Sequence, residues 1–141
     1  MTMATKAGVS TSAAPETELR RGRCPCGAVT CPVSGPMRSI SLCRCGQCRR
    51  EVGHARASVT APRVAVAVAR PVAWFRLGDE AERGFRPRVS ASMFWRMDGA
   101  DTRSVPLARR DSPARLILEK HIIASHTGDY CEIEGDLPRS P

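Results

Sequence analysis

Apolar and polar residues alternate along most of this chain in short stretches, which Pro, Gly and Asp separate. Alternation with a period of two residues is typical of a strand with one buried face. The pattern predicts a cysteine-rich turn entering a strand at residues 22–33, and further strands at residues 39–42, 57–60, 64–69, 72–77, 92–97 and 130–134. Many short strands with frequent turns indicate a mainly β domain.

Three kinds of segment interrupt this pattern. Residues 49–52 and 112–115 favour short helical turns, and residues 84–92 are predicted to form an irregular basic loop. Residues 1–19 are rich in Ser, Thr and Ala and predict a disordered tail. The expected folded domain therefore spans residues 20–141.

Composition limits the class of protein. The chain has 141 residues, of which 42% are hydrophobic but only 4% aromatic, so we expect one domain with a largely aliphatic core. The longest apolar run, at residues 64–69, is too short to cross a bilayer, which needs about 20 residues. Neither a secretory signal nor an Arg-rich presequence is visible, which predicts a cytoplasmic protein that does not contact a membrane.

The basic charge of the chain comes almost entirely from arginine. Basic residues outnumber acidic ones by 22 to 14, and 20 of them are arginines. The planar guanidinium group suits carboxylates and phosphates. A formal net charge of +8 therefore fits a nucleic acid or a small anionic substrate. The arginines are scattered along the chain, so a solvated charged surface is an equally good interpretation.

Seven cysteines carry the most specific signal, and six of them precede residue 49. An odd number without an export signal argues against a disulfide framework and favours metal binding. Cys43, Cys45 and Cys48 form a C-x-C-x-x-C motif that brings three thiolates to one tight turn. Three protein ligands leave a zinc ion an open, catalytic position, whereas four make a structural site. Cys26 or Cys31 would close the site, and the spacing leaves both arrangements open.

Two runs and a series of shorter motifs resemble one known family. The first run, Arg23 to Val29, reads R-C-P-C-G-A-V, and the second, Cys43 to Arg50, reads C-R-C-G-Q-C-R-R with Gly53 after it. Shorter motifs follow in order at residues 73–75, 83–85, 94–95, 121–122, 128–130, 132–133 and 137–139. The ordered set is similar to the glutathione-dependent formaldehyde-activating enzyme family, which shares its domain with centromere protein V. The resemblance covers residues 20–141.

The resemblance implies a mainly β fold, described as a tent of short antiparallel sheets, with two zinc sites. It implies that Cys43, Cys45 and Cys48 hold the catalytic zinc and are the catalytic residues. The implied activity is that of a carbon–sulfur lyase, which condenses glutathione with formaldehyde to S-(hydroxymethyl)glutathione or runs the reverse reaction. Arg44 stands where the family usually has a His between the first two central cysteines.

The second zinc site implied by the resemblance is incomplete in this chain. Cys24 and Cys26 would be half of it, but Arg86 and Val89 stand where the family has the other two cysteines. Neither side chain ligates zinc, so we expect one zinc ion at the central site and loss of the structural site. Three consequences stay open: Arg86 pairs with the orphan thiolates, one of these thiolates joins the central site, or the protein is a poorly stable copy.

The expected partner is a small anionic thiol such as glutathione. Its two carboxylates would be bound by Arg44, Arg49 and Arg50, which lie within or directly after the central motif. The alternative is a catalytically degenerate zinc domain that serves as a binding module for an anionic partner, with nucleic acid as one candidate. We do not expect nucleic acid, because the few aromatic residues are mostly embedded in predicted strands.

Overall fold

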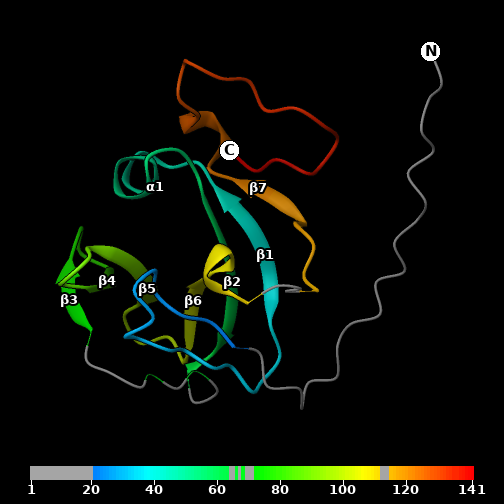
Figure 1. Ribbon diagram of the computed structural model, residues 1–141. Coiled ribbons are helices and arrows are strands. Elements are labelled where there is room, and N and C mark those ends of the chain that lie inside the picture. The colour runs from blue at the N-terminus through cyan, green and yellow to red at the C-terminus, as the bar shows by residue number, and fades with distance from the viewer. Residues whose placement is uncertain (1–20, 64–65, 67, 69–71, 112–114) are drawn as a thin grey trace.

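Seven strands form one mixed sheet in the computed structural model, which describes residues 21–63, 66, 68, 72–111 and 115–141 (Figure 1). The order across the sheet is β3-β4-β5-β6-β2-β1-β7. Neighbouring strands are antiparallel except β1 and β7, which are parallel. The strands are β1 (Arg38–Cys43), β2 (Arg56–Pro62), β3 (Ala73–Arg76), β4 (Ala81–Arg86), β5 (Ala91–Met97), β6 (Thr102–Pro106) and β7 (Lys120–Ile122).

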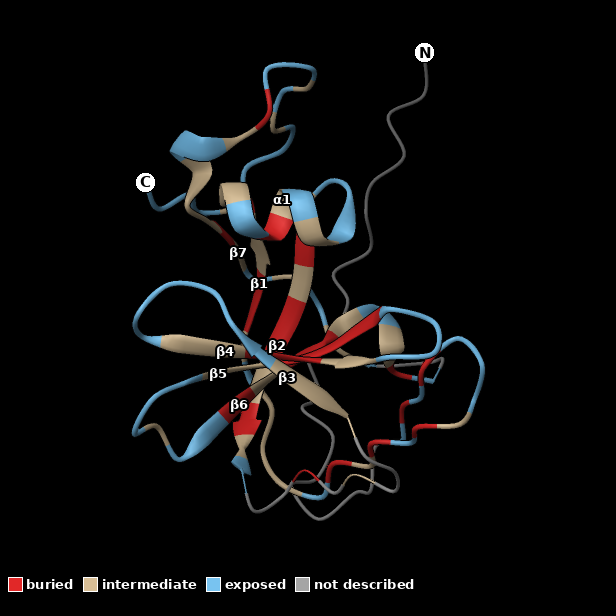
Figure 2. Ribbon diagram, turned by 90° about the vertical axis from the view of Figure 1, so that its left-hand side faces the viewer, coloured by how far each residue is buried: buried red, intermediate tan, exposed pale blue. Residues whose placement is uncertain are grey.

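The mainly β fold class predicted from the sequence is confirmed. The resemblance implied several short antiparallel sheets, whereas here the strands belong to one sheet. The joint between β5 and β6 consists of a single register pair, Trp95 opposite Ser104. On either side of it the β3-β4-β5 group and the β2-β1-β7 group run in clearly different directions (Figure 2). The sheet therefore bends sharply at this joint.

Strand β1 leads directly into the turn that carries the central cysteine motif. Helix α1 (Gly46–Val52) starts after Cys45, whose extended backbone and sulfur cap the helix by accepting from the N–H of Cys48. The helix ends at Gly53, whose φ of 88° is a left-handed conformation that glycine adopts without strain. The helical turn predicted at residues 49–52 is confirmed as the last part of α1.

Four predicted strands are confirmed as β1, β2, β3 and β5, and three other predictions are wrong. Residues 22–33 contain the predicted turn, but they form isolated bridges and no strand. Residues 84–92 are not a loop, because β4 and β5 pair there as a hairpin around the turn at residues 87–90. Residues 130–134 form no strand. Strand β6 was not predicted. The alternation of apolar and polar residues is not visible in β4 and β6, because Arg83 and Arg103 are buried where an apolar residue would be expected.

Two further predictions fall mostly outside the described residues. Of the strand predicted at 64–69, Val66 and Val68 are described, and Val66 forms an isolated antiparallel bridge with Val33. The helical turn predicted at 112–115 is described only at Arg115. The short 3₁₀ turns of the described chain are η2 (Leu107–Arg109) and η3 (Ala124–His126).

The core is aliphatic with one large ring at its centre. Phe94 is fully buried and stacks on Trp74, with 6.1 Å between the ring centroids. The guanidinium of Arg96 lies 3.8 Å above the Trp74 ring. The other core side chains are mainly valines, with Met93, Ile40 and two cysteines. Among the described residues, no helix has the length and apolar character needed to span a bilayer.

We predict that Phe94→Ala destabilises the protein by about 3–5 kcal/mol, because it removes a fully buried ring and leaves a cavity. The measurement is the free energy of unfolding from urea titration. Phe75→Ala is the matched control: Phe75 lies on the edge strand β3 and is 38% exposed, so its truncation costs less. Equal losses for the two variants would contradict this placement of the core.

Candidate metal centre

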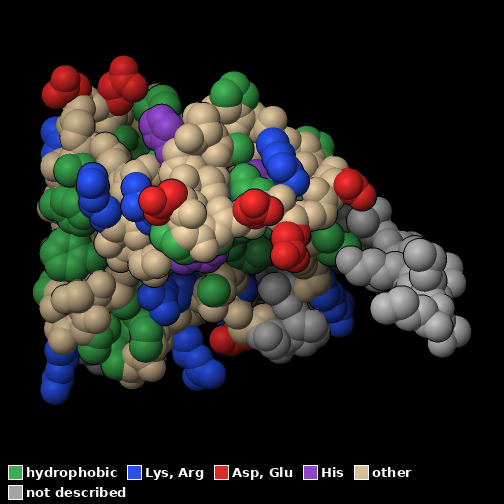
Figure 3. All heavy atoms as spheres, turned by 90° about the horizontal axis from the view of Figure 1, so that it is seen from above, with side chains coloured by type: hydrophobic (Ala, Val, Ile, Leu, Met, Phe, Trp, Pro, Cys, Tyr) green, Lys and Arg blue, Asp and Glu red, His purple; other side chains and the backbone are tan. Residues whose placement is uncertain are grey.

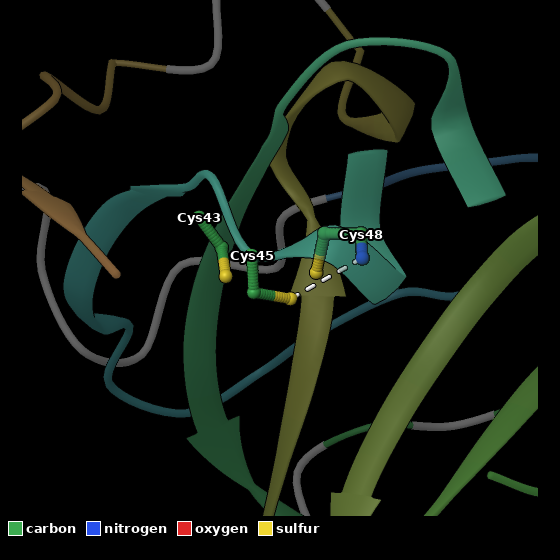
Figure 4. A group of neighbouring side chains, drawn as sticks. All are labelled: Cys43, Cys45 and Cys48. Atoms are coloured by element: carbon green, nitrogen blue, oxygen red, sulfur yellow. Dashed lines mark hydrogen bonds between the residues drawn. The ribbon is translucent and has the colours of Figure 1, made fainter. Parts of the chain in front are cut away.

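Three thiols converge where β1 passes into α1 (Figure 4). Cys43 ends the strand, Cys45 caps the helix and Cys48 lies in its first turn. Their sulfur atoms all lie within 4.8 Å of one another. Two sulfurs on a tetrahedral zinc are about 3.8 Å apart, given Zn–S bonds of about 2.3 Å. The donor set and its spacing therefore fit a zinc ion, with small adjustments of the side chains.

The group offers three protein donors. No fourth His, Cys, Asp or Glu side chain joins it among the described residues. Cys48 is buried, whereas Cys43 and Cys45 are partly exposed. This is the arrangement of an open metal site rather than a closed structural one. It answers one question that the spacing left open: neither Cys26 nor Cys31 belongs to this group.

Hydrogen bonds within the group give its thiols different pKa values. The N–H of Cys48 donates to the Cys45 sulfur over 3.2 Å. A hydrogen bond from the Cys48 thiol lowers the pKa of Cys43. The same hydrogen bond, together with burial, raises the pKa of Cys48. Without a metal, Cys43 is therefore more acidic than an ordinary thiol and Cys48 is less acidic.

A buried ion cluster lies behind Cys48. Arg83 of β4 is 3% exposed and donates to the Glu51 carboxylate of α1 and to the Gln47 side chain over 3.1 Å. Both terminal nitrogens of Arg83 also approach the Cys48 sulfur, at 4.0 and 3.9 Å. The positive charge of Arg83 acts to lower the pKa of Cys48, but the hydrogen bond to Cys43 and burial outweigh it. Arg83 therefore connects the sheet, the helix and the thiol group.

Arg56 of β2 completes the cluster. It is 4% exposed, lies 3.5 Å from Glu51 and donates to the Ser92 hydroxyl over 2.7 Å. Its Nε and Nη2 atoms are buried and have no hydrogen-bond partner among the described residues. Burial lowers the pKa of Arg56, while the charges of Glu51, Cys48 and Cys43 act in the opposite direction. The carboxylate of Glu51, and any thiolate in the cysteine group, therefore helps to hold this buried cation in place.

The three arginines predicted to bind substrate differ in accessibility. Arg44 is buried and donates to His121 Nδ1 over 3.3 Å, with Cys131 at 4.0 Å. Burial and the cation of Arg44 lower the pKa of His121, which suits a neutral ring that accepts this bond. Arg49 is half-buried, and Arg50 is exposed on α1. Their contact with a substrate stays a prediction.

Cys24 and Cys26 lie apart from the central group. Their sulfurs are 3.2 Å from each other, and Cys24 is buried beside the core while Cys26 is exposed. Burial raises the pKa of Cys24, but hydrogen bonds from the Val29 N–H and from Cys26 outweigh it and lower the pKa. No hydrogen bond or ion pair joins Arg86 to either thiol in the described structure.

Arg56, Glu51 and Arg83 are the site residues that sequence reasoning missed. Arg83 stands in one of the matched motifs, at residues 83–85, and this was the one available signal. Nothing in the sequence distinguishes Arg56 from the other arginines.

A family model described as "Glutathione-dependent formaldehyde-activating enzyme" matches residues 19–122. The chain belongs to this family.

Family membership confirms the resemblance found in the sequence. It supports a glutathione-dependent, formaldehyde-activating type of function at the level of the family, whose members generally carry lyase-type activity. The fold is similar to the crystal structure of a Rhodobacter sphaeroides protein, with a TM-score of 0.53 and 23% identity over 65% of this chain and 88% of that one. A search of the curated proteins gave no match.

We predict that Cys45→Ser greatly weakens zinc binding at the central site while the fold is retained. Serine is a good helix N-cap, so its hydroxyl can still accept from the Cys48 N–H, but it is a poor zinc ligand. Native mass spectrometry should find about one zinc per wild-type chain and a loss of zinc in the variant, with circular dichroism unchanged. Cys131→Ser is the control and should keep its zinc.

We predict that Glu51→Gln costs about 3–5 kcal/mol of unfolding free energy, because it leaves two buried guanidinium groups without their carboxylate. Urea titration measures the loss. Glu82→Gln removes a carboxylate that pairs with the more exposed Arg96 and should cost less than about 1 kcal/mol. A similar small effect at both positions would show that the cluster behind Cys48 carries little of the stability.

Proposed function

We propose that this protein joins glutathione to formaldehyde at the three-thiol group, forming S-(hydroxymethyl)glutathione, or catalyses the reverse reaction. The observation that carries the proposal is the convergence of three thiols with no fourth donor among the described residues, in a chain of this family. In the forward direction a C–S bond forms between the glutathione sulfur and the formaldehyde carbon. The thiol proton ends on the former carbonyl oxygen.

The chain's own residues would hold a zinc ion through Cys43, Cys45 and Cys48. When bound, zinc favours the thiolate form of a coordinating thiol and can polarise a carbonyl oxygen. The turn between β1 and α1 fixes the three sulfurs before any metal binds, since Cys45 is already held as the helix cap. This order in the free protein reduces the entropy lost when the site is filled.

The buried arginines supply the charge that such a site needs. Three thiolates around one Zn²⁺ carry a net charge of minus one. Arg56, Arg83 and Glu51 together carry a net charge of plus one, and two of their atoms lie within about 4 Å of Cys48. A glutathione thiolate bound there would add negative charge in a partly buried place, and the nearby guanidinium groups of Arg83 and Arg56 would make this less unfavourable.

The carboxylates of glutathione need cations that solvent can reach. Arg44, Arg56 and Arg83 are all buried, so we infer that Arg49 and Arg50 are the better candidates on the central motif. Both follow Cys48 directly on α1. They would hold the tripeptide so that its thiol reaches the open side of the cysteine group.

The alternative of a non-catalytic module for an anionic partner has weaker support. Acidic side chains lie among the basic ones on the face seen from above, so this face presents no continuous basic patch (Figure 3). Trp74 packs between Phe94 and Arg96, so both contacts of its ring are made within the fold rather than with a partner. The enzyme assay below also tests this alternative, since zinc-loaded protein without turnover would favour it.

We predict that zinc-loaded protein accelerates the condensation of glutathione with formaldehyde above the uncatalysed rate. Nuclear magnetic resonance of ¹³C-formaldehyde follows the hydroxymethyl product directly, and exchange spectroscopy resolves catalysis of a rapid equilibrium. Cys45→Ser should return the rate to background, and Arg50→Ala should raise KM more than it lowers kcat. Background rates with fully zinc-loaded wild-type protein would contradict the proposed function.

A further inference from the structure

The Cys24–Cys26 pair is built more like a dithiol than like half of a zinc site. Its two sulfurs are 3.2 Å apart, closer than the roughly 3.8 Å between two sulfurs on one zinc. A tight turn holds them together, since the Gly27 N–H donates to the Cys24 carbonyl over 2.9 Å and Gly27 has a φ of 72°. The turn therefore places the Cys26 sulfur next to the Cys24 sulfur.

A second zinc ion does not fit the residues around this pair. In the described part of the chain, no third His, Cys, Asp or Glu donor lies with Cys24 and Cys26 at a spacing that could hold a metal. Arg86 and Val89 occupy the positions where the resemblance implied cysteines, and Val89 is exposed. Two thiols alone make a weak zinc site. The pair is therefore free for other thiol chemistry.

The two thiols differ in a way that suits stepwise exchange. Cys26 is exposed, whereas Cys24 is only 1% exposed and its sulfur accepts from the Val29 N–H over 3.3 Å. An external disulfide can reach Cys26 but not Cys24. The buried sulfur then lies directly beside the one that has reacted, and its hydrogen bond favours the thiolate that must attack.

We propose that Cys24 and Cys26 form a redox-active dithiol that exchanges with small disulfides of the glutathione class. The Cys26 thiolate attacks one sulfur of the small disulfide, which forms a mixed disulfide and releases one small thiol. The Cys24 thiolate then attacks the Cys26 sulfur, which closes the Cys24–Cys26 bond and releases the second small thiol. The protein loses two electrons and two protons, and the small disulfide gains both. This proposal does not depend on the proposed function of the central site.

Cys31 is the competing partner within the fold. It is fully buried, and Arg110 donates to its sulfur over 2.5 Å and to its carbonyl over 2.7 Å. Moving Cys31 toward Cys24 would destabilise the protein, because Arg110 would lose both of these hydrogen bonds. The closing step should therefore select Cys26 over Cys31.

The test uses the full-length, zinc-loaded protein, in which the metal masks Cys43, Cys45 and Cys48. The protein is incubated with glutathione disulfide, and its intact mass and its peptides are measured after alkylation. The wild type should lose two hydrogens and yield one peptide with Cys24 linked to Cys26. Cys24→Ser should stop at one glutathionyl group on Cys26. Cys26→Ser should give neither product at this pair, and Cys131→Ser is the control that should close the bond like the wild type.

Three results would overturn the proposal. The first is a wild-type protein that keeps a glutathionyl group on Cys26 without closing the bond. The second is a Cys24–Cys31 link, and the third is a second zinc ion bound to the pair in native mass spectrometry. The wild-type peptide map decides the matter even if Cys24→Ser fails to fold, and Cys26→Ser alters only an exposed side chain.

Discussion

The buried pairing of Arg83 and Arg56 with Glu51 is the interaction on which the site depends. Each partner comes from a different element: β4, β2 and α1. A buried charge destabilises the folded state unless it is paired, so folding is favourable only when all three side chains meet. This requirement fixes α1 over the sheet, and with it the position of Cys48. A seven-residue helix has little stability of its own, so this contact matters more than helix propensity.

The same cluster explains what could be predicted from the sequence and what could not. The central cysteine turn and the last part of α1 were predictable because their signals are local: metal-ligand spacing and a glycine after the helical turn. The Cys45 cap and the start of α1 at Gly46 were not predicted. Strands β4 and β6 were obscured because arginines occupy buried positions in them, so their hydrophobic alternation is interrupted. The contacts of Arg83 and Arg56 with Glu51 are long-range, and no pattern in the chain encodes them.

Arg44 illustrates the limit of arguing from proximity in sequence. It lies between two of the three central cysteines, which placed it beside the metal as a substrate-binding candidate. In the structure its side chain is buried against His121 and Cys131 and connects the motif to the last part of the chain. Two residues that alternate along an extended backbone point in opposite directions. Position in the sequence therefore did not reveal that the Arg44 side chain is buried against the last part of the chain.

The segment around Cys24 is held in place by packing and backbone pairing. Its two ends are anchored by bridges between Arg23 and Thr30 and between Gly22 and Arg110, and Val29 is fully buried in the core. A structural zinc ion contributes on the order of 10 kcal/mol to the folding of small metal-dependent domains. Burying a few aliphatic side chains supplies about 1.5–3 kcal/mol each, so packing can replace much of that contribution. The segment is therefore held by contacts that do not involve a metal, and the reactivity that we propose for Cys24 and Cys26 depends on their exposure and on each other.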